Sequence, residues 1–98
     1  MVNVIVRHKV SDFAKWKHVF DDHFRMRHAA GELNHRVFHN HDDGLDLTLF
    51  FEWESLEMAR SFFQSDRLKN GMQQAGVVGT PEIVFLDEVR SLRRTAAD

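Results

Sequence analysis

The sequence predicts an α+β protein of the ferredoxin-like class, with the element order β-α-β-β-α-β and a four-stranded antiparallel sheet that carries its helices on one face. Three observations support this class. Four short runs alternate apolar and polar residues, as half-buried strands do, and two longer runs repeat apolar residues at helical spacing. The chain has 98 residues, 43% of them hydrophobic, which fits one compact domain. We place this domain at residues 1–90 and expect a mobile C-terminal tail at residues 91–98.

The first two elements are a strand at residues 2–10 and a helix of about five turns that ends before Gly31. Ser11 and Asp12 offer an N-cap between them. Every second side chain of the strand falls on one face, which holds Val2, Val4, Val6, His8 and Val10. The stripe of the helix that faces the sheet holds Phe13, Trp16, Phe20, Phe24 and Arg27.

Residues 34–41 and 45–53 predict a hairpin. Gly44 and the two aspartates before it are typical of the turn that joins two such strands. The first run is rich in His, Asn and Arg, which is typical of an edge strand. The second run is better buried, because one face holds Leu45, Leu47, Leu49, Phe51 and Trp53.

Residues 55–75 are predicted to be helical, either as one kinked helix or as two short helices. Ser55 can cap the start, and Ser65 with Asp66 offers a second cap within the run. Residues 76–81 are expected to be a loop, and the last strand is expected from Ile83 to about residue 89.

Composition and charge exclude several functions. The chain has no Cys, so it has no disulfide, thiolate metal site or thiol nucleophile. Its net charge of -2 has the wrong sign for a phosphate backbone, and the third strand lacks the Lys/Arg-Gly-aromatic platform of RNA-recognition domains. No apolar run approaches the roughly 18 residues that a membrane span needs. We therefore expect a cytoplasmic protein with neither nucleic acid nor membrane as a partner.

The second face of the sheet is predicted to be an interface. Ile5, Phe50 and one member of each pair in residues 83–86 must point away from the face that the helices cover. A bare apolar sheet face of that size is typical of a contact surface. The sequence therefore predicts a homodimer in which two sheets pack face to face.

Two histidines are the candidate catalytic residues, and a small-molecule ligand is expected between the helices and the sheet. His8 shares a strand face with valines, and His23 borders the inward stripe of the first helix, so the two rings can face one cavity and transfer protons. The alternative is that each is an ordinary buried or boundary histidine. Arg27 is a candidate clamp for an anionic group. The candidate substrate-binding walls are Trp16, Phe20, Trp53 and Phe63.

A metal site is a weaker alternative. His39 and His41 have the spacing that puts two imidazoles on one face of a strand, with His35 on the same side and Asp43 as a further ligand. A solvated polar edge strand explains the same residues without a metal. We therefore expect no metal and no other cofactor.

Five segments carry a resemblance to a known family: Val6-Arg7-His8-Lys9-Val10, Asp12-Phe13-x-x-Trp16-Lys17-x-x-Phe20, Met26-Arg27 with Ala30-Gly31-Glu32, Phe51-Glu52-Trp53-Glu54, and residues 75–82. Together they resemble small bacterial proteins of the dimeric α+β barrel superfamily, which includes antibiotic biosynthesis monooxygenases, polyketide cyclases and haem-degrading enzymes. The resemblance spans about residues 2 to 90.

The resemblance implies the dimeric barrel form of the fold, a pocket between helices and sheet, and for some members oxidation of aromatic compounds without metal or flavin. The chain has no Tyr, so the phenolic group of the best-known monooxygenases is missing, and residues 55–75 hold no His that could be a haem ligand. We predict a cofactor-independent monooxygenase or cyclase for an aromatic or polyketide-like compound. The alternative is a non-catalytic, small-molecule-binding or stress-related dimeric module.

Overall fold

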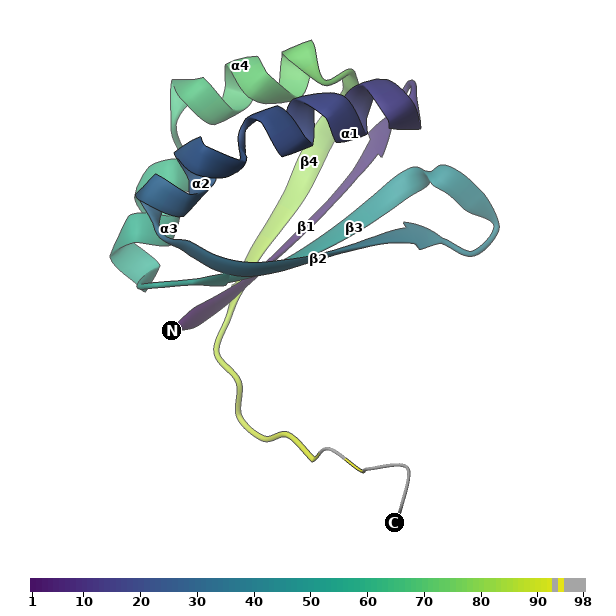
Figure 1. Ribbon diagram of the computed structural model, residues 1–98. Helices are drawn as coiled ribbons and strands as arrows, with labels where there is room; N and C mark the ends of the chain where they lie inside the picture. Colours follow the sequence, from purple (N-terminus) through teal and green to yellow (C-terminus); the bar gives the residue numbers. More distant parts are fainter. Residues whose placement is uncertain (93, 95–98) are drawn as a thin grey trace.

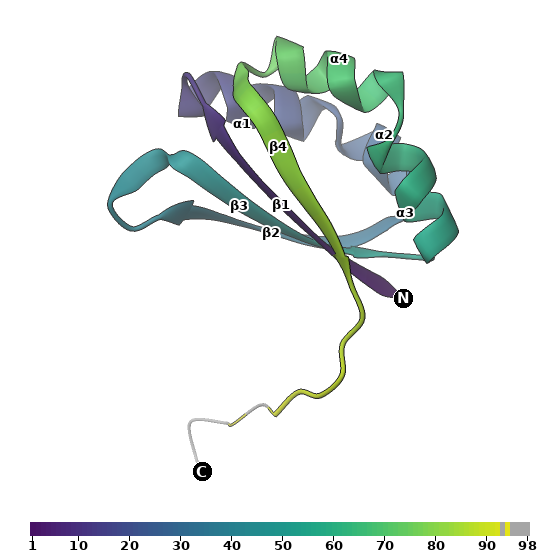
Figure 2. The same cartoon turned by 180° about the vertical axis from the view of Figure 1, so that it is seen from behind.

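Four antiparallel strands form one sheet in the order β2-β3-β1-β4, and the helices all pack on the same face of it (Figures 1 and 2). The structure is a computed structural model that describes residues 1–92 and 94. The predicted α+β, ferredoxin-like class is confirmed. The elements are β1 Val2–Val10, α1 Phe13–Asp22, α2 Phe24–Ala30, β2 Glu32–Asn40, β3 Asp43–Trp53, α3 Leu56–Phe63, α4 Asp66–Gln74 and β4 Val77–Leu86.

The long first helix was predicted as one unit, and this is wrong, because it breaks at His23 into α1 and α2. His23 has φ −93° and ψ 10°, outside the helical region. The last carbonyls of a helix lack intrahelical donors, and here the Phe20 carbonyl accepts a hydrogen bond from Arg27 Nη1 at 2.7 Å. The break thus allows a buried arginine to satisfy the end of α1.

The last strand starts earlier than predicted. The loop expected at residues 76–81 is wrong, because β4 runs from Val77 to Leu86 and pairs with β1 on both sides of a bulge. The bulge lies opposite His8, and on β4 it contains Gly79 with φ +75° and Pro81, which has no amide N–H to donate. The run at residues 55–75 forms two helices, the second capped by the Ser65 hydroxyl, which accepts from the Leu68 amide.

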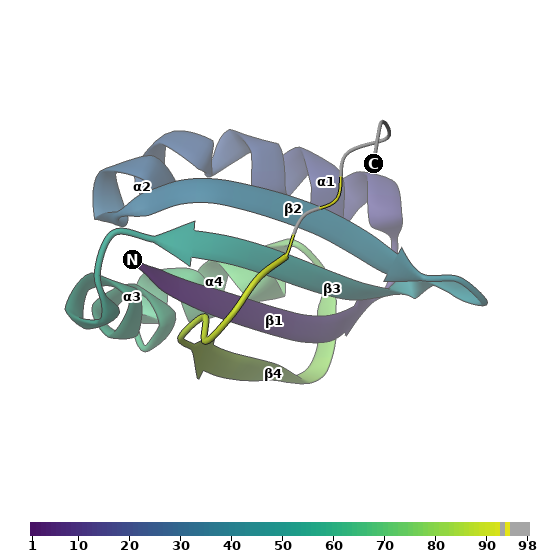
Figure 3. The ribbon, with the colours of Figure 1, turned by 90° about the horizontal axis from the view of Figure 1, so that it is seen from below.

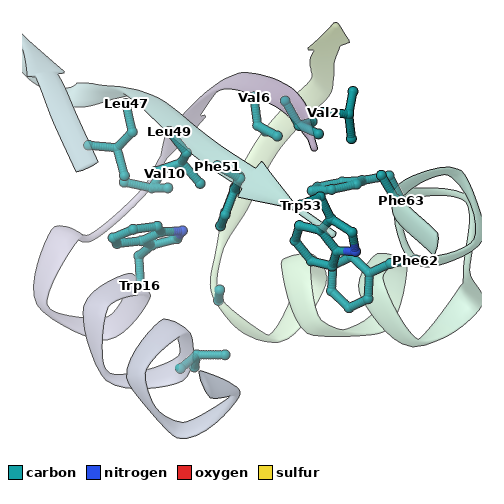
Figure 4. Packing of buried hydrophobic residues seen from close by; sticks show 14 residues of the cluster. Val2, Val6, Val10, Trp16, Leu47, Leu49, Phe51, Trp53, Phe62 and Phe63 are labelled. Carbon is teal, nitrogen blue, oxygen red and sulfur yellow. The ribbon is translucent and has the colours of Figure 1, made fainter. Parts of the chain in front are cut away.

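The core lies between the sheet and the helices. The predicted alternation of β1 is confirmed, since Val2, Val4, Val6, His8 and Val10 are all buried. Figure 4 shows two groups of core side chains: Trp16 faces the β3 residues Leu47, Leu49 and Phe51, and Trp53 packs with Phe62 and Phe63.

The opposite face of the sheet carries no helix, as the view from below shows (Figure 3). Ile5 on β1 pairs with Phe50 on β3 and with Val84 on β4, so these three apolar side chains share that face. After β4 the chain leaves on this side of the sheet, and residues 87–92 form neither helix nor strand (Figure 1). Residues 93 and 95–98 of the predicted tail lie outside the described residues.

Candidate functional site

A cavity of about 60 Å³ lies between the helices and the sheet. Its walls are almost entirely apolar, and its polar side chains are two histidines and two arginines. Six of the seven predicted site residues line it: His8, Trp16, Phe20, His23, Arg27 and Phe63. The two histidines that the sequence proposed as partners therefore border one cavity.

His8 enters the cavity from β1 at the bulge, where its neighbours Arg7 and Lys9 are paired with β4 in different registers. Its imidazole is buried, with the Trp16 ring 6.1 Å away between centroids. Burial lowers the pKa of His8 below its ordinary value of 6.5, because the charged ring loses hydration; its own backbone and the Asp46 carboxylate oppose this more weakly. His8 is therefore a neutral proton acceptor near pH 7.

His23 reaches the cavity from the junction of α1 and α2. Its ring lies against Gly71 of α4, since a Cβ built on that glycine would be 3.3 Å from both Nδ1 and Cε1 of His23. A glycine inside a helix costs about 1 kcal/mol relative to alanine. The absence of a side chain at Gly71 gives the His23 ring its place beside the cavity.

Arg27 belongs to a buried ion pair that the sequence did not predict. Its Nε donates to Glu32 Oε1 at 2.8 Å, and both side chains are at most 5% exposed. Glu32 Oε2 is 3.1 Å from His35 Nδ1, so the Glu32 carboxylate contacts both Arg27 and His35. Glu32 directly follows the glycine that ends α2, and no periodicity marks such a residue as buried.

One wall of the cavity is a row of stacked groups. Trp16 and Phe20 lie 4.7 Å apart between centroids with their planes 21° from parallel, and the Arg27 guanidinium carbon is 3.7 Å from the Phe20 centroid. His8 stands at the other end of the row, beside Trp16. Trp16 and Arg27 cover the faces of Phe20, so the stack offers ring edges rather than a flat surface. An aromatic ligand can pack edge to face against such a stack, with a base at each end for its polar groups.

Trp53, the seventh predicted site residue, does not line the cavity. It is fully buried among Phe51, Phe62 and Phe63, and its Nε1 donates to the Ala30 carbonyl at 2.9 Å. It shares a strand face with Phe51, as predicted, but it lies at the end of β3 that α3 covers. Its position is that of a core residue.

The cavity opens beside a wider hollow of about 580 Å³ between α2 and α3. Met26, Phe62 and Arg67 line both spaces and so form the partition between them. A cavity of about 150 Å³ is known to admit benzene, so a ring enters this smaller one only if the partition moves. Met26, with three rotatable side-chain bonds, is the wall residue best suited to that movement.

The histidines proposed as metal ligands do not come together. His35 contacts Glu32, and His39 Nδ1 lies 2.8 Å from the Asn40 carbonyl, while His41 is exposed in the turn. Within residues 1–92 and 94, no group of three or more His, Asp or Glu side chains is arranged to hold a metal ion.

The lowered pKa of His8 predicts a pH-dependent contribution to stability. As pH falls through 6.5, the unfolded chain binds a proton at this position before the folded protein does, so the free energy of unfolding decreases. The His8→Leu variant lacks this loss. Urea unfolding at pH 8, 6.5 and 5 should therefore show a smaller decrease for His8→Leu than for the unmodified protein.

The exposed His18 on α1 provides the control, because His18→Leu also removes one histidine but leaves the cavity intact. An equal pH dependence in the His8→Leu variant and the unmodified protein would show that burial of His8 does not affect its protonation.

Comparison with known proteins finds relatives by structure alone. No protein-family model and no curated protein matches this sequence. SnoaB, a cofactor-independent oxygenase from Streptomyces nogalater, is 15% identical, with a TM-score of 0.77 over 95% of this chain and 97% of that one. An antibiotic biosynthesis monooxygenase-like protein of Bordetella bronchiseptica is also 15% identical, with a TM-score of 0.76 over 91% and 97% of the two chains.

A similar protein of Caulobacter crescentus is 20% identical, with a TM-score of 0.71 over 91% of this chain and 90% of that one. In the described part of this chain, no helix has the length and apolar character to cross a membrane. At these identities the likeness concerns the fold. The chain has the ferredoxin-like α+β fold of the antibiotic biosynthesis monooxygenase-like proteins.

Proposed function

We propose that this protein is a cofactor-independent oxygenase or cyclase that acts on an aromatic or polyketide-like compound bound in the cavity. The observation that carries the proposal is the position of His8 and His23 on one apolar cavity beside the stacked rings of Trp16 and Phe20. The fold is also that of SnoaB, a cofactor-independent oxygenase. A cytoplasmic location, suggested by the absence of Cys, belongs to the same proposal.

The proposed reaction begins with removal of a proton from the substrate. His8, neutral because it is buried, takes a proton from an acidic CH2 or OH group, and the apolar surroundings make the resulting anion reactive. In an oxygenase, the carbanion gives electrons to dissolved O2 and forms a peroxide anion. This anion takes the proton back from His8 to become a hydroperoxide, which loses water. The CH2 group and O2 thus become C=O and H2O. In a cyclase, the carbanion attacks a carbonyl group of the same molecule.

Anthrone, an aromatic ketone with an acidic methylene, tests this function. The protein should accelerate O2 uptake and convert anthrone with one O2 into anthraquinone and water. His8→Gln and His23→Gln should each lower kcat about 100-fold, as loss of a general acid or base does. His18→Gln, on the outer face of α1, should have no effect.

Oxygen consumption and quinone absorbance report the rate, and titration of the protein with anthrone under nitrogen reports binding. Saturable binding without accelerated O2 uptake would contradict the oxygenase and favour a non-catalytic binding module. If anthrone does not bind, this substrate class is wrong.

We further propose that the protein is a homodimer formed through the open face of the sheet. Ile5, Phe50 and Val84 are partly exposed at the middle of that face, and Leu86 adds to them at its end. A contiguous apolar surface on a sheet favours burial against a partner. Two copies of the face form the closed barrel of the superfamily that the sequence resembles.

Phe50→Glu should convert the dimer into a monomer, because a charge at the centre of the interface would be buried without a partner. Sedimentation equilibrium at micromolar concentration measures the change. The control is Phe24→Glu, which places the same charge on an exposed aromatic residue of α2. If the unmodified protein sediments only as a monomer, the sheet face is not the dimer interface.

A further inference from the structure

The polar residues of the cavity wall are all bases. They are His8, His23, Arg27 and Arg67, and no Asp or Glu belongs to the wall. This is unexpected in a chain with 15 acidic and 13 basic Asp, Glu, Lys and Arg residues and a net charge of -2. A surface with one sign of charge selects ligands of the opposite sign.

Two residues that line this cavity, His8 and Arg27, each have a buried polar atom without a hydrogen-bond partner. Among the described residues, the unpartnered buried side-chain nitrogen and oxygen atoms are Nδ1 of His8 and Nη2 of Arg27. Buried polar groups are nearly always hydrogen-bonded, so an unpartnered one at a cavity indicates where a ligand or a water binds. The two residues stand at opposite ends of the Trp16–Phe20 wall.

The chemistry of Arg27 determines which ligand atoms can accept a hydrogen bond from its unpartnered nitrogen. Nε is bonded to Glu32 and Nη1 to the Phe20 carbonyl, which fixes the guanidinium plane and leaves Nη2 as a donor. A donor on a cation makes its strongest hydrogen bond with an anionic oxygen. Glu32 neutralises much of the Arg27 charge, so a second cation is needed to favour an anion over a neutral acceptor.

Arg67 supplies this second cation. It lies on α4 at the partition between the cavity and the outer hollow, and no carboxylate in residues 1–92 is ion-paired with it. Glu57 lines the outer hollow but not the cavity. An anion that enters through the partition therefore passes Arg67 and meets Arg27 inside.

We infer that the ligand is a planar aromatic acid bound as its anion, with its anionic oxygen on Arg27 Nη2 and its ring packed against the edges of the Trp16–Phe20 stack. This inference rests on the proposed function, and it names the substrate class of the same cavity. Within the proposed reaction it also places Arg27 beside the negative oxygen that forms when a phenol or an enolisable ketone loses a proton. Arg27 then stabilises the product of proton removal by His8.

Benzoate and benzamide test the inference, because they have the same shape and differ in charge. Their affinities are measured by titration of the ¹⁵N-labelled protein, with the indole N–H signal of Trp16 as the reporter of the cavity. Benzoate should bind about tenfold more tightly than benzamide, the difference between a charged and a neutral hydrogen bond in a buried site.

Two variants connect the preference to the named residues. Arg27→Lys keeps a cation for Glu32 but removes Nη2, and it should abolish most of the preference for benzoate. Arg67→Gln, at the partition, should weaken the binding of benzoate several-fold and leave the binding of benzamide unchanged. Lys69→Gln is the control, because Lys69 is exposed on the same helix and does not line the cavity.

Each outcome separates the inference from the function on which it rests. Equal affinity for the two probes overturns the anion preference and leaves the small-molecule site in place. A preference that persists in both arginine variants also overturns the inference. Binding of neither probe shows that the cavity holds water only, and then both the inference and the proposed ligand site are wrong.

Discussion

Arg27→Met alone should destabilise the protein by about 3–5 kcal/mol, because it leaves the Glu32 carboxylate buried without its cation. Arg27 and Glu32 are among the most deeply buried charged residues, and Glu32 is only 2% exposed. The variant also removes the donor to the Phe20 carbonyl at the end of α1 and the guanidinium that covers the Phe20 ring. The free energy of unfolding in urea at pH 7 measures the loss.

The double variant Arg27→Met with Glu32→Gln should recover much of this loss, because it removes both charges together. A useful comparison is Lys17→Met, which breaks the Lys17–Asp21 pair on α1, where the two side chains are 62% and 59% exposed. That change should have a much smaller effect, since solvent screens the pair. Equal losses in Arg27→Met and Lys17→Met would show that burial of the Arg27–Glu32 pair adds nothing to its contribution to stability.

The parts of the fold that the sequence predicts best are those with a simple period. Alternation along β1 and β3 has period two, and once the valines are assigned to the core, His8 must share their side. The bounds of β1 and the burial of His8 on the helix side of the sheet follow from this alone. The position of His23 beside the cavity follows less directly, because its prediction also requires knowing which side of the first helix faces the sheet.

The features that were not predicted depend on contacts between distant residues. The break at His23 has no proline or glycine to announce it, and it is explained only by Arg27 turning back to the Phe20 carbonyl. Glu32 is buried because α2 and β2 bring Arg27 and His35 to either side of it. Pairing with β1 likewise extends β4 through a glycine and a proline that are typical of a loop.

Trp53 shows that the alternation of a strand predicts which side of the sheet a residue lies on, but not whether the residue lines a cavity. Parity places it on the helix side together with Phe51, and this is where it lies. Parity does not say which part of that side is hollow. The cavity follows α1 and α4, whereas Trp53 lies under α3 and beside the turn at Gly31.

Gly31→Ala should destabilise the protein by about 2–4 kcal/mol, from two causes that can be separated. Gly31 has φ +120°, a conformation that side chains with a Cβ rarely adopt. A Cβ at this position would also lie 2.6 Å from Nε1 of Trp53, a ring held in place by the core and by its bond to the Ala30 carbonyl. The free energy of unfolding in urea measures the effect.

Gly44→Ala is the matched control, because a Cβ on Gly44 meets nothing within 4 Å, and its stability should change little. A double-mutant cycle with Trp53→Phe then divides the effect, since phenylalanine removes the indole nitrogen that the new Cβ would strike. If steric conflict dominates, Gly31→Ala will lower the free energy of unfolding much less in the Trp53→Phe protein than in the unmodified protein. If the loss is unchanged, backbone conformation alone requires glycine at the end of α2, and the close approach of Trp53 is a consequence of that turn rather than its cause.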